Sequence, residues 1–177
     1  VIQNVATDGD ASAALATQAD AANASAAAGR DYYDLRCYRL KPDTRLKAPV
    51  TRDRLDSYLE KALLPALDRR GVKNVGVFSE LEINRAEKTS KPKAESPVWV
   101  FIPHTSMESL IGVNAEITED PAVMKAVAGY LDTAKANPAF ERIDSWLLLA
   151  FKAAPRLTVP DFSKSRAPNR FFEMRTY

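Results

Sequence analysis

The sequence contains one cysteine, one histidine and only six glycines among its 177 residues. A single cysteine excludes an intrachain disulfide framework and zinc sites built on several thiolates. A single histidine, His104, excludes histidine-rich metal sites and the HExxH class of hydrolases. So few glycines leave little material for a glycine-rich phosphate loop, and no apolar run reaches the ~18 residues that a membrane-spanning helix needs.

The sequence also has no large excess of charge of either sign, because it contains 25 Lys and Arg and 23 Asp and Glu. This balance argues against a protein that seeks polyanions, and we predict no nucleic-acid partner. The chain is 46% hydrophobic and 27% charged, which is normal for a soluble globular domain of ordinary size. None of the residue patterns predicts a bound metal or cofactor.

Residues 1–30 contain twelve alanines and no Phe, Tyr or Trp. Such a segment lacks the large apolar groups that offset ordering entropy, so we predict a disordered leader or linker. The alternative is the remnant of an export signal, since Ala24, Ser25 and Ala26 form a small-x-small cleavage pattern. No apolar or basic region of a signal peptide precedes them, and an exported or a cytoplasmic location remains open.

Residues 31–40 (DYYDLRCYRL) alternate with period two, which predicts a half-buried strand. The apolar set consists of Tyr33, Leu35 and Cys37, and the amphipathic set consists of Tyr32, Asp34, Arg36 and Tyr38. We expect the apolar set to face the helices and the amphipathic set to face away from them. Cys37 is then a small buried hydrophobe rather than a nucleophile.

The segments that follow alternate between helical and strand-like spacing of their apolar residues. A helix is predicted from Thr51, its cap, to Gly71, with a kink or break at Pro65. Strands are expected over residues 74–81, 97–103 and 142–151, and the last is apolar on both faces in its second half, which predicts a central or enclosed strand. Residues 82–96 are polar and are interpreted as a long connection. Helical segments are expected at residues 106–113 and again from Asp120 and Pro121.

The resulting order, βαββαβ, is that of a ferredoxin-like α+β domain over residues 31–154, with both helices on one face of an antiparallel sheet. The other face would carry Tyr32, Tyr38, Phe78, Trp99 and Trp146. A large aromatic surface on a free sheet is an association site, so we expect the sheet to pack against a second sheet.

The sequence also repeats itself once, since residues 32–38 (YYDLRCY) are matched by residues 171–177 (FFEMRTY). We interpret residues 170–177 as the first strand of a truncated second copy of the domain, joined through a proline-bearing linker at residues 155–169. An isolated strand of this kind needs a partner, so we expect the chain to self-associate with sheet facing sheet.

The segments YYDLRCYRL, LLPALDRRGV, VGVF, PVWVFIP, DSWLLLAF and RAPNRFFEMRTY resemble the NIPSNAP family. The resemblance covers residues 31–177 and implies a dimeric α/β-barrel fold, usually built as two ferredoxin-like halves in one chain. Here the first half and the opening strand of the second are present. The family includes vesicle- or mitochondria-associated proteins in animals and mostly uncharacterised bacterial proteins, some with export signals. It has no agreed catalytic residues, so none is transferred.

Several residues are candidates for a site. Asp34 and Arg36 are expected either as an internal ion pair or as a polar anchor for a ligand held between sheets. The ligand-binding candidates are Tyr32, Asp34, Arg36, Tyr38, Phe78, Trp99 and Trp146. His104 is a weak catalytic candidate, with a loop or helix-capping histidine as the alternative.

Three classes of function follow from these observations. The first is a non-enzymatic binding or interaction module that holds a small apolar or aromatic ligand between sheets. The second is an enzyme, since dimeric α/β barrels resemble cofactor-free monooxygenases and haem-linked enzymes; His104, Trp99, Asp144 and Trp146 would then form the set to examine. The third is a structural oligomer without a pocket. No catalytic role is assigned to any residue on the sequence alone.

Overall fold

The computed structural model describes residues 29–40, 49–131, 141–161 and 171–175. The predicted leader lies outside the described residues except for its last two positions, and so does the second part of the linker. The strands are β1 (Tyr32–Arg39), β2 (Gly76–Ser79), β3 (Leu81–Asn84), β4 (Thr89–Pro92), β5 (Val98–His104) and β6 (Arg142–Leu149). The helices are α2 (Pro49–Tyr58), α3 (Leu64–Arg69), α4 (Met107–Glu119) and α5 (Pro121–Leu131), with a π-helical turn, η1 (Leu59–Leu63), between the first two.

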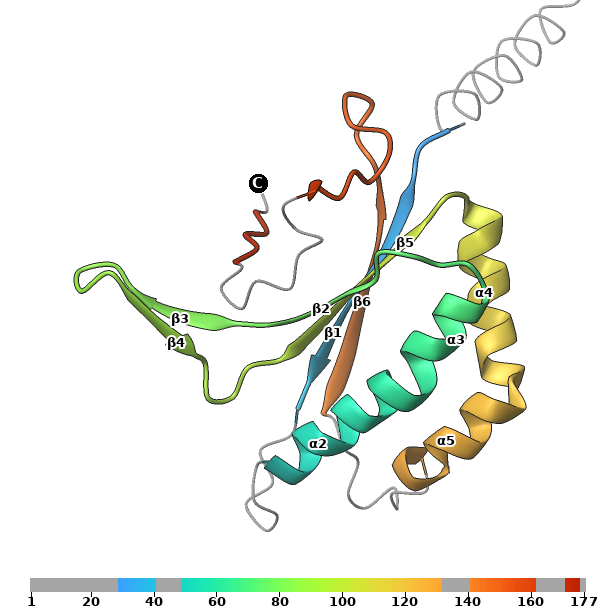
Figure 1. Ribbon diagram of the computed structural model, residues 1–177, viewed down its shortest axis with the longest axis horizontal. Coiled ribbons are helices and arrows are strands. Elements are labelled where there is room, and N and C mark those ends of the chain that lie inside the picture. Colours follow the sequence, from blue (N-terminus) through green and yellow to red (C-terminus); the bar gives the residue numbers. More distant parts are fainter. Residues whose placement is uncertain (1–28, 41–48, 132–140, 162–170, 176–177) are drawn as a thin grey trace, which may run out of the picture.

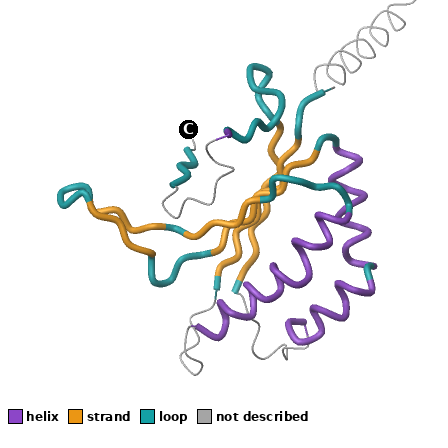
Figure 2. The backbone as a smooth tube through the Cα atoms, viewed as in Figure 1, coloured by secondary structure: helices purple, strands orange, loops and turns teal. Residues whose placement is uncertain are grey.

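Four strands form an antiparallel sheet in the order β2-β5-β1-β6. All four α-helices lie on one side of this sheet, as Figures 1 and 2 show. The strand order and the one-sided helix layer are those of a ferredoxin-like domain, which confirms the predicted α+β class. We call the side of the sheet that is turned toward the helices the helix face, and the opposite side the second face.

The core lies between the helix face and the helices. Its buried members include Val98, Val100 and Ile102 of β5, Leu55 of α2, Leu63 and Leu67 of the continuing helix, and Val113 and Ile117 of α4. Side chains that pair directly across an antiparallel ladder lie on the same face. The pairs Tyr38–Val98, Arg36–Val100 and Asp34–Ile102 therefore place the amphipathic set of β1 on the helix face.

The predicted facing of β1 was therefore wrong, because the two sets of side chains lie on the opposite faces from those expected. Tyr32, Asp34, Arg36 and Tyr38 face the helices, and Tyr33, Leu35 and Cys37 face away from them. Both sets are buried at their centres: Tyr38 is 2% exposed and Leu35 is 5% exposed. The difference in polarity between the two sets therefore did not reflect a difference in burial. The polar pair, Asp34 and Arg36, is hydrogen-bonded beneath the helices.

Two further expectations require correction. β6 is an edge strand, because it ends the sheet order, and its apolar residues on both faces are partly exposed instead of enclosed. Residues 82–96 do not form a simple connection, because β3 and β4 pair as an antiparallel hairpin that extends away from the helix layer in Figure 1. The turn of this hairpin contains Lys88 at φ 53°, a left-handed conformation without the glycine or asparagine that normally indicates it.

The first helical segment begins at Pro49, two residues before the predicted cap, so that Thr51 lies inside the helix. The irregularity predicted at Pro65 takes the form of the π-helical turn η1, which directly precedes α3. Proline lacks the N–H that an ordinary helix would use at this position. Gly71 ends the helix at φ 75°, as predicted.

Residues 171–175 form no strand within this chain, although they repeat part of β1. Figure 1 shows this segment on the side of the sheet opposite the helices. The ring of Phe172 lies 5.0 Å from that of Phe78 on β2, measured between centroids. The segment therefore contacts the second face at its β2 edge.

Candidate functional site

A buried group of polar side chains lies on the helix face of β1. The guanidinium of Arg36 donates two hydrogen bonds to Asp34, from Nε at 2.9 Å and from a terminal nitrogen at 2.6 Å. The same terminal nitrogen donates to Oδ1 of Asn114 on α4 at 2.7 Å. Burial lowers the pKa of Arg36, but the bonds and charge of Asp34 outweigh it and raise the pKa above its usual value. Arg36 is therefore a permanent cation held between a strand and a helix.

His104 ends β5 on the same face and is 2% exposed. Its Nδ1 lies 3.2 Å from the hydroxyl of Ser109 on α4, whereas its buried Nε2 has no hydrogen-bond partner among the described residues. Burial lowers the pKa of His104, the charge of Arg36 lowers it further, and Asp34 opposes both. The imidazole is therefore neutral at pH 7 and keeps one ring nitrogen without a partner. We call Asp34, Arg36, His104, Ser109 and Asn114 the polar cluster.

Two tyrosines extend the buried polar region. Tyr38 is the next residue of β1 on the helix face, and Tyr58 on α2 packs against the same core. Burial raises the pKa of Tyr38, against the opposing charge of Arg36, and it raises the pKa of Tyr58 to about 12. Both phenols are therefore protonated at neutral pH.

The second face is aromatic. The indole rings of Trp99 and Trp146 stack at 5.7 Å across β1, on which they flank Leu35 and Cys37. Tyr33 and Phe101 form another ring pair at 5.0 Å. Cys37 is fully buried under this layer, and burial raises the pKa of its thiol.

A charged rim borders the aromatic layer at the end of β1 and β6. Arg39 donates from Nε to Asp144 at 2.8 Å, and Arg142 pairs with the other oxygen of the same carboxylate. Hydrogen bonds from Arg39 and then from Arg142 hold the pKa of Asp144 below its usual range. Together with Glu141 and Trp146, these residues line an open hollow of about 700 Å³.

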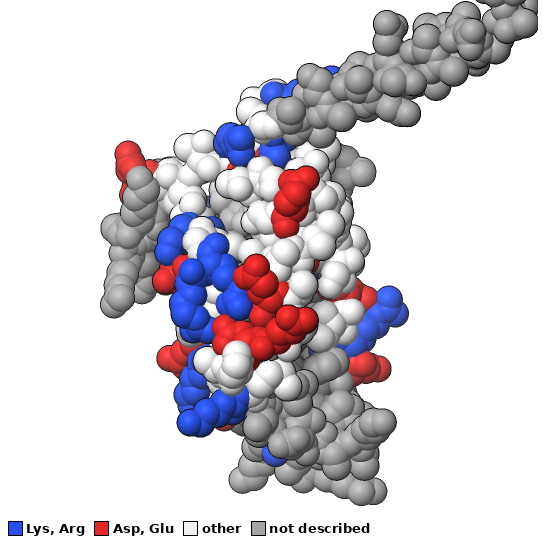
Figure 3. Space-filling model, turned by 90° about the vertical axis from the view of Figure 1, so that its right-hand side faces the viewer, with Lys and Arg blue, Asp and Glu red and all other residues white. Residues whose placement is uncertain are grey.

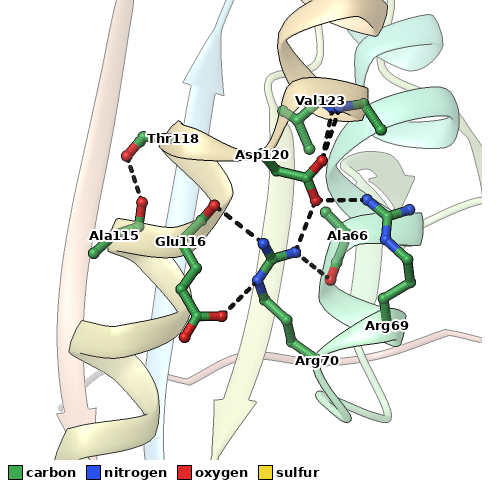
Figure 4. A network of polar contacts seen from close by, with 9 residues as sticks. Ala66, Arg69, Arg70, Ala115, Glu116, Thr118, Asp120 and Val123 are labelled. Atoms are coloured by element: carbon green, nitrogen blue, oxygen red, sulfur yellow. Dashed lines mark hydrogen bonds and ion pairs between the residues drawn. The ribbon is translucent and has the colours of Figure 1, made fainter.

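The outer surface of the helices is also charged but carries both signs side by side, as Figure 3 shows. Arg70 at the end of α3 bonds Glu116 at 3.0 Å and Asp120 at 3.1 Å, and Arg69 bonds Asp120 at 2.8 Å. Asp120 also accepts hydrogen bonds from the backbone N–H groups of Ala122 and Val123 in α5 (Figure 4), and it therefore caps the N-terminus of this helix. This network joins α3 to the α4–α5 corner and is fully paired, so it is structural.

The structure divides the seven predicted ligand-binding residues between two faces. Tyr32, Asp34, Arg36 and Tyr38 lie on the helix face, and Phe78, Trp99 and Trp146 lie on the second face. His104 is likewise separated by the sheet from Trp99, Asp144 and Trp146. Sequence reasoning missed Asn114 and Ser109, because nothing in their local pattern distinguishes them from other polar residues of an amphipathic helix.

Among the described residues, no three or more His, Cys, Asp or Glu side chains are placed so that they could hold a metal ion. In the same part of the chain, no helix has both the length and the apolar character needed to cross a membrane.

No family model matches the sequence, and no curated protein matches it either. The fold does match solved structures. An uncharacterised NIPSNAP-like domain protein from Burkholderia xenovorans superposes with a TM-score of 0.50 at 15% identity, covering 73% of this chain and 93% of that one.

Two weaker matches have a similar coverage. A NIPSNAP family protein from Agrobacterium tumefaciens has a TM-score of 0.45 at 12% identity, over 71% of this chain and 90% of the other. A dimeric protein of unknown function with a ferredoxin-like fold, from Bacteroides fragilis, has a TM-score of 0.41 at 10% identity, over 67% and 94%. From the strand order and the Burkholderia match, the described residues have the fold of a NIPSNAP-like domain.

Proposed function

We propose that this chain is a binding and assembly module whose second face packs against the second face of another copy. The observation that carries the proposal is the exposure of large apolar side chains beside the aromatic layer. Trp146 and Leu148 of β6 both point to the second face, and each is 41% exposed. Exposed apolar surface of this kind is typical of an association site, and on this face it lies beside the stacked indole rings.

The layout of this face also supports an interface. Aromatic rings occupy its centre, and the ion pairs of Arg39 and Asp144 lie at its edge. Protein interfaces commonly have an apolar, aromatic centre and a polar rim. Among the described residues, the ring contact of Phe172 lies at the β2 edge of this face, and Trp146 and Leu148 on the β6 side are each 41% exposed, which leaves apolar surface there for a partner.

We further propose that the hollow beside Trp146 holds a small aromatic or apolar ligand between the two sheets. Its volume of about 700 Å³ falls within the ~300–1,000 Å³ of small-molecule sites. An aromatic ligand can stack on the indole, while the arginines at the rim bind a polar group at its other end. A structural oligomer without a ligand is the alternative.

Sedimentation of the purified chain over a range of concentrations tests the assembly. We expect a reversible dimer, and we expect Leu148→Glu to abolish it because the new charge would be buried in the interface. Ile111→Glu is the matched control, since Ile111 is a 62% exposed apolar residue on α4, far from the second face.

A wild-type chain that stays monomeric at high concentration overturns the assembly, and so does equal loss of the dimer in both variants. Native mass spectrometry of protein purified from its source then counts the subunits and detects a retained ligand. A dimer that carries no ligand supports the structural alternative.

A further inference from the structure

The helix face carries a second feature that the assembly of second faces does not use. Across the ladder, His104 pairs with Tyr32 and Tyr32 pairs with Leu149, so the three side chains form one row on this face. Ile102, Asp34 and Leu147 form the next row. Each row begins beneath the helices on β5 and ends on the edge strand β6.

Exposure increases along these rows. Ile102 is fully buried and His104 is 2% exposed, whereas Leu149 is 40% exposed and Leu147 is 55% exposed. The polar cluster is therefore deeply buried on its β5 side and bordered by exposed apolar side chains on its β6 side. A molecule that approaches over β6 would meet the leucine side chains first, then Tyr32 and Asp34 of β1, and His104 behind them.

We propose that the polar cluster is a binding site for a small neutral molecule with an apolar body and one hydroxyl group, of which a phenol is the simplest example. The apolar body would rest on Leu147 and Leu149, and the hydroxyl group would bond Nε2 of His104.

The proposed ligand needs a hydroxyl group because of how the imidazole of His104 is hydrogen-bonded. Its Nε2 is buried without a partner in the described residues, while Ser109 holds Nδ1 and thereby orients the ring. Buried polar atoms are nearly always hydrogen-bonded, so an oriented ring with one free nitrogen is an unusual arrangement. A hydroxyl group can donate to that nitrogen or accept from it, and it fits either tautomer.

The proposed ligand carries no net charge because Arg36 is already paired. The positive charge of Arg36 is matched by Asp34 at 2.6 Å, and its further contacts, with the amide of Asn114 and the phenol of Tyr38, are to neutral groups. An ionic ligand would enter this region without a free counter-charge and would lose its hydration, which is costly. The exposed leucines at the border favour an apolar body for the same reason.

The single histidine permits a direct test, because a chain labelled with ¹⁵N-histidine gives imidazole signals from His104 alone. We expect phenol to shift the Nε2 resonance saturably, and toluene, which lacks the hydroxyl group, to leave it unchanged. If phenol causes no saturable shift up to millimolar concentration, the proposal is overturned and Nε2 is held by water.

Two pairs of variants locate the contacts, with phenol binding followed by saturation transfer to the ligand. His104→Asn keeps a polar atom near the position of Nδ1 but removes Nε2, and it should abolish binding, whereas His104→Gln restores a polar atom near Nε2 and should rescue part of it. Leu147→Gln should weaken binding about tenfold, which corresponds to about 1.4 kcal/mol.

Leu148→Gln is the control for Leu147, because the two residues are neighbours on opposite faces of the same strand. It should leave phenol binding unchanged, and equal weakening by both leucine variants would refute the assignment to the helix face. Since Leu148 belongs to the proposed assembly surface, the phenol site and the assembly can fail independently of each other.

Discussion

Replacing Arg36 by alanine tests whether the pair with Asp34 is as buried as the structure places it. The side chains of Arg36 and Asp34 are only 17% and 11% exposed. The substitution removes every hydrogen bond from Arg36 to the carboxylate and to Asn114, so a buried charge remains without its partner. Breaking a buried pair in this way costs about 3–5 kcal/mol.

The free energy of unfolding, measured by urea denaturation, is the relevant quantity. The repeated motif supplies a matched control, since Arg175 pairs with Glu173 at the same spacing and at 2.7 Å, but both side chains are at least 64% exposed. Arg175→Ala should therefore change stability by less than about 0.5 kcal/mol.

A double variant separates the charge from the packing. Asp34→Leu combined with Arg36→Met replaces both charges by apolar groups and should restore most of the loss, because an apolar pair of similar volume does not need its own counter-charge. A loss below about 1 kcal/mol in Arg36→Ala would refute the reasoning, since it would mean that water reaches Asp34.

Two further measurements address the other buried groups. The pKa of the His104 imidazole should lie below its ordinary value of about 6.5, because burial disfavours the charged form. The unfolded chain then binds the proton more tightly than the folded one, so the free energy of unfolding should decrease as the pH falls below about 6.5. This part of the pH dependence should be absent in His104→Gln. Cys37 should not react with a thiol reagent in the folded protein, because it is fully buried. Trp146→Ala should accelerate the modification of Cys37 by uncovering the second face. A reaction at the rate of a free thiol in the wild-type protein would contradict the burial.

The sequence predicted the order and type of the main elements because each has a clear period. The prediction of which side of β1 faces the helices was wrong, because both sides are buried, one under the helices and the other under Trp99 and Trp146. Alternation identifies a facing only where one side is open to water. The partner of Arg36 on the helix, Asn114, lies 78 residues away, and no local pattern indicates such a contact.

The edge strand β6 shows the complementary failure. Its leucines on both faces predicted a central strand, because apolar residues on both sides normally mean cover on both sides. The described part of the chain covers this strand only in part, since Leu147 and Leu148 are 55% and 41% exposed. The pattern is consistent with a strand whose partners include groups outside this chain, which is what the two proposals assign to its two faces.

The last prediction concerns the second occurrence of the β1 motif. Residues 171–175 form no strand in the single chain, and Phe171, Phe172 and Met174 are 57–68% exposed. Among the described residues, the ring contact between Phe172 and Phe78 joins the segment to the second face. We therefore expect its amide hydrogens to exchange rapidly in the monomer and to become protected when the chain self-associates, because a strand motif needs both ladder partners and apolar cover. Hydrogen exchange measured below and above the association concentration decides the matter, with a chain extended beyond Tyr177 as a comparison. If residues 171–175 exchange at random-coil rates in the dimer as well, the repeated motif is a tail, and the interpretation as the first strand of a second copy is wrong.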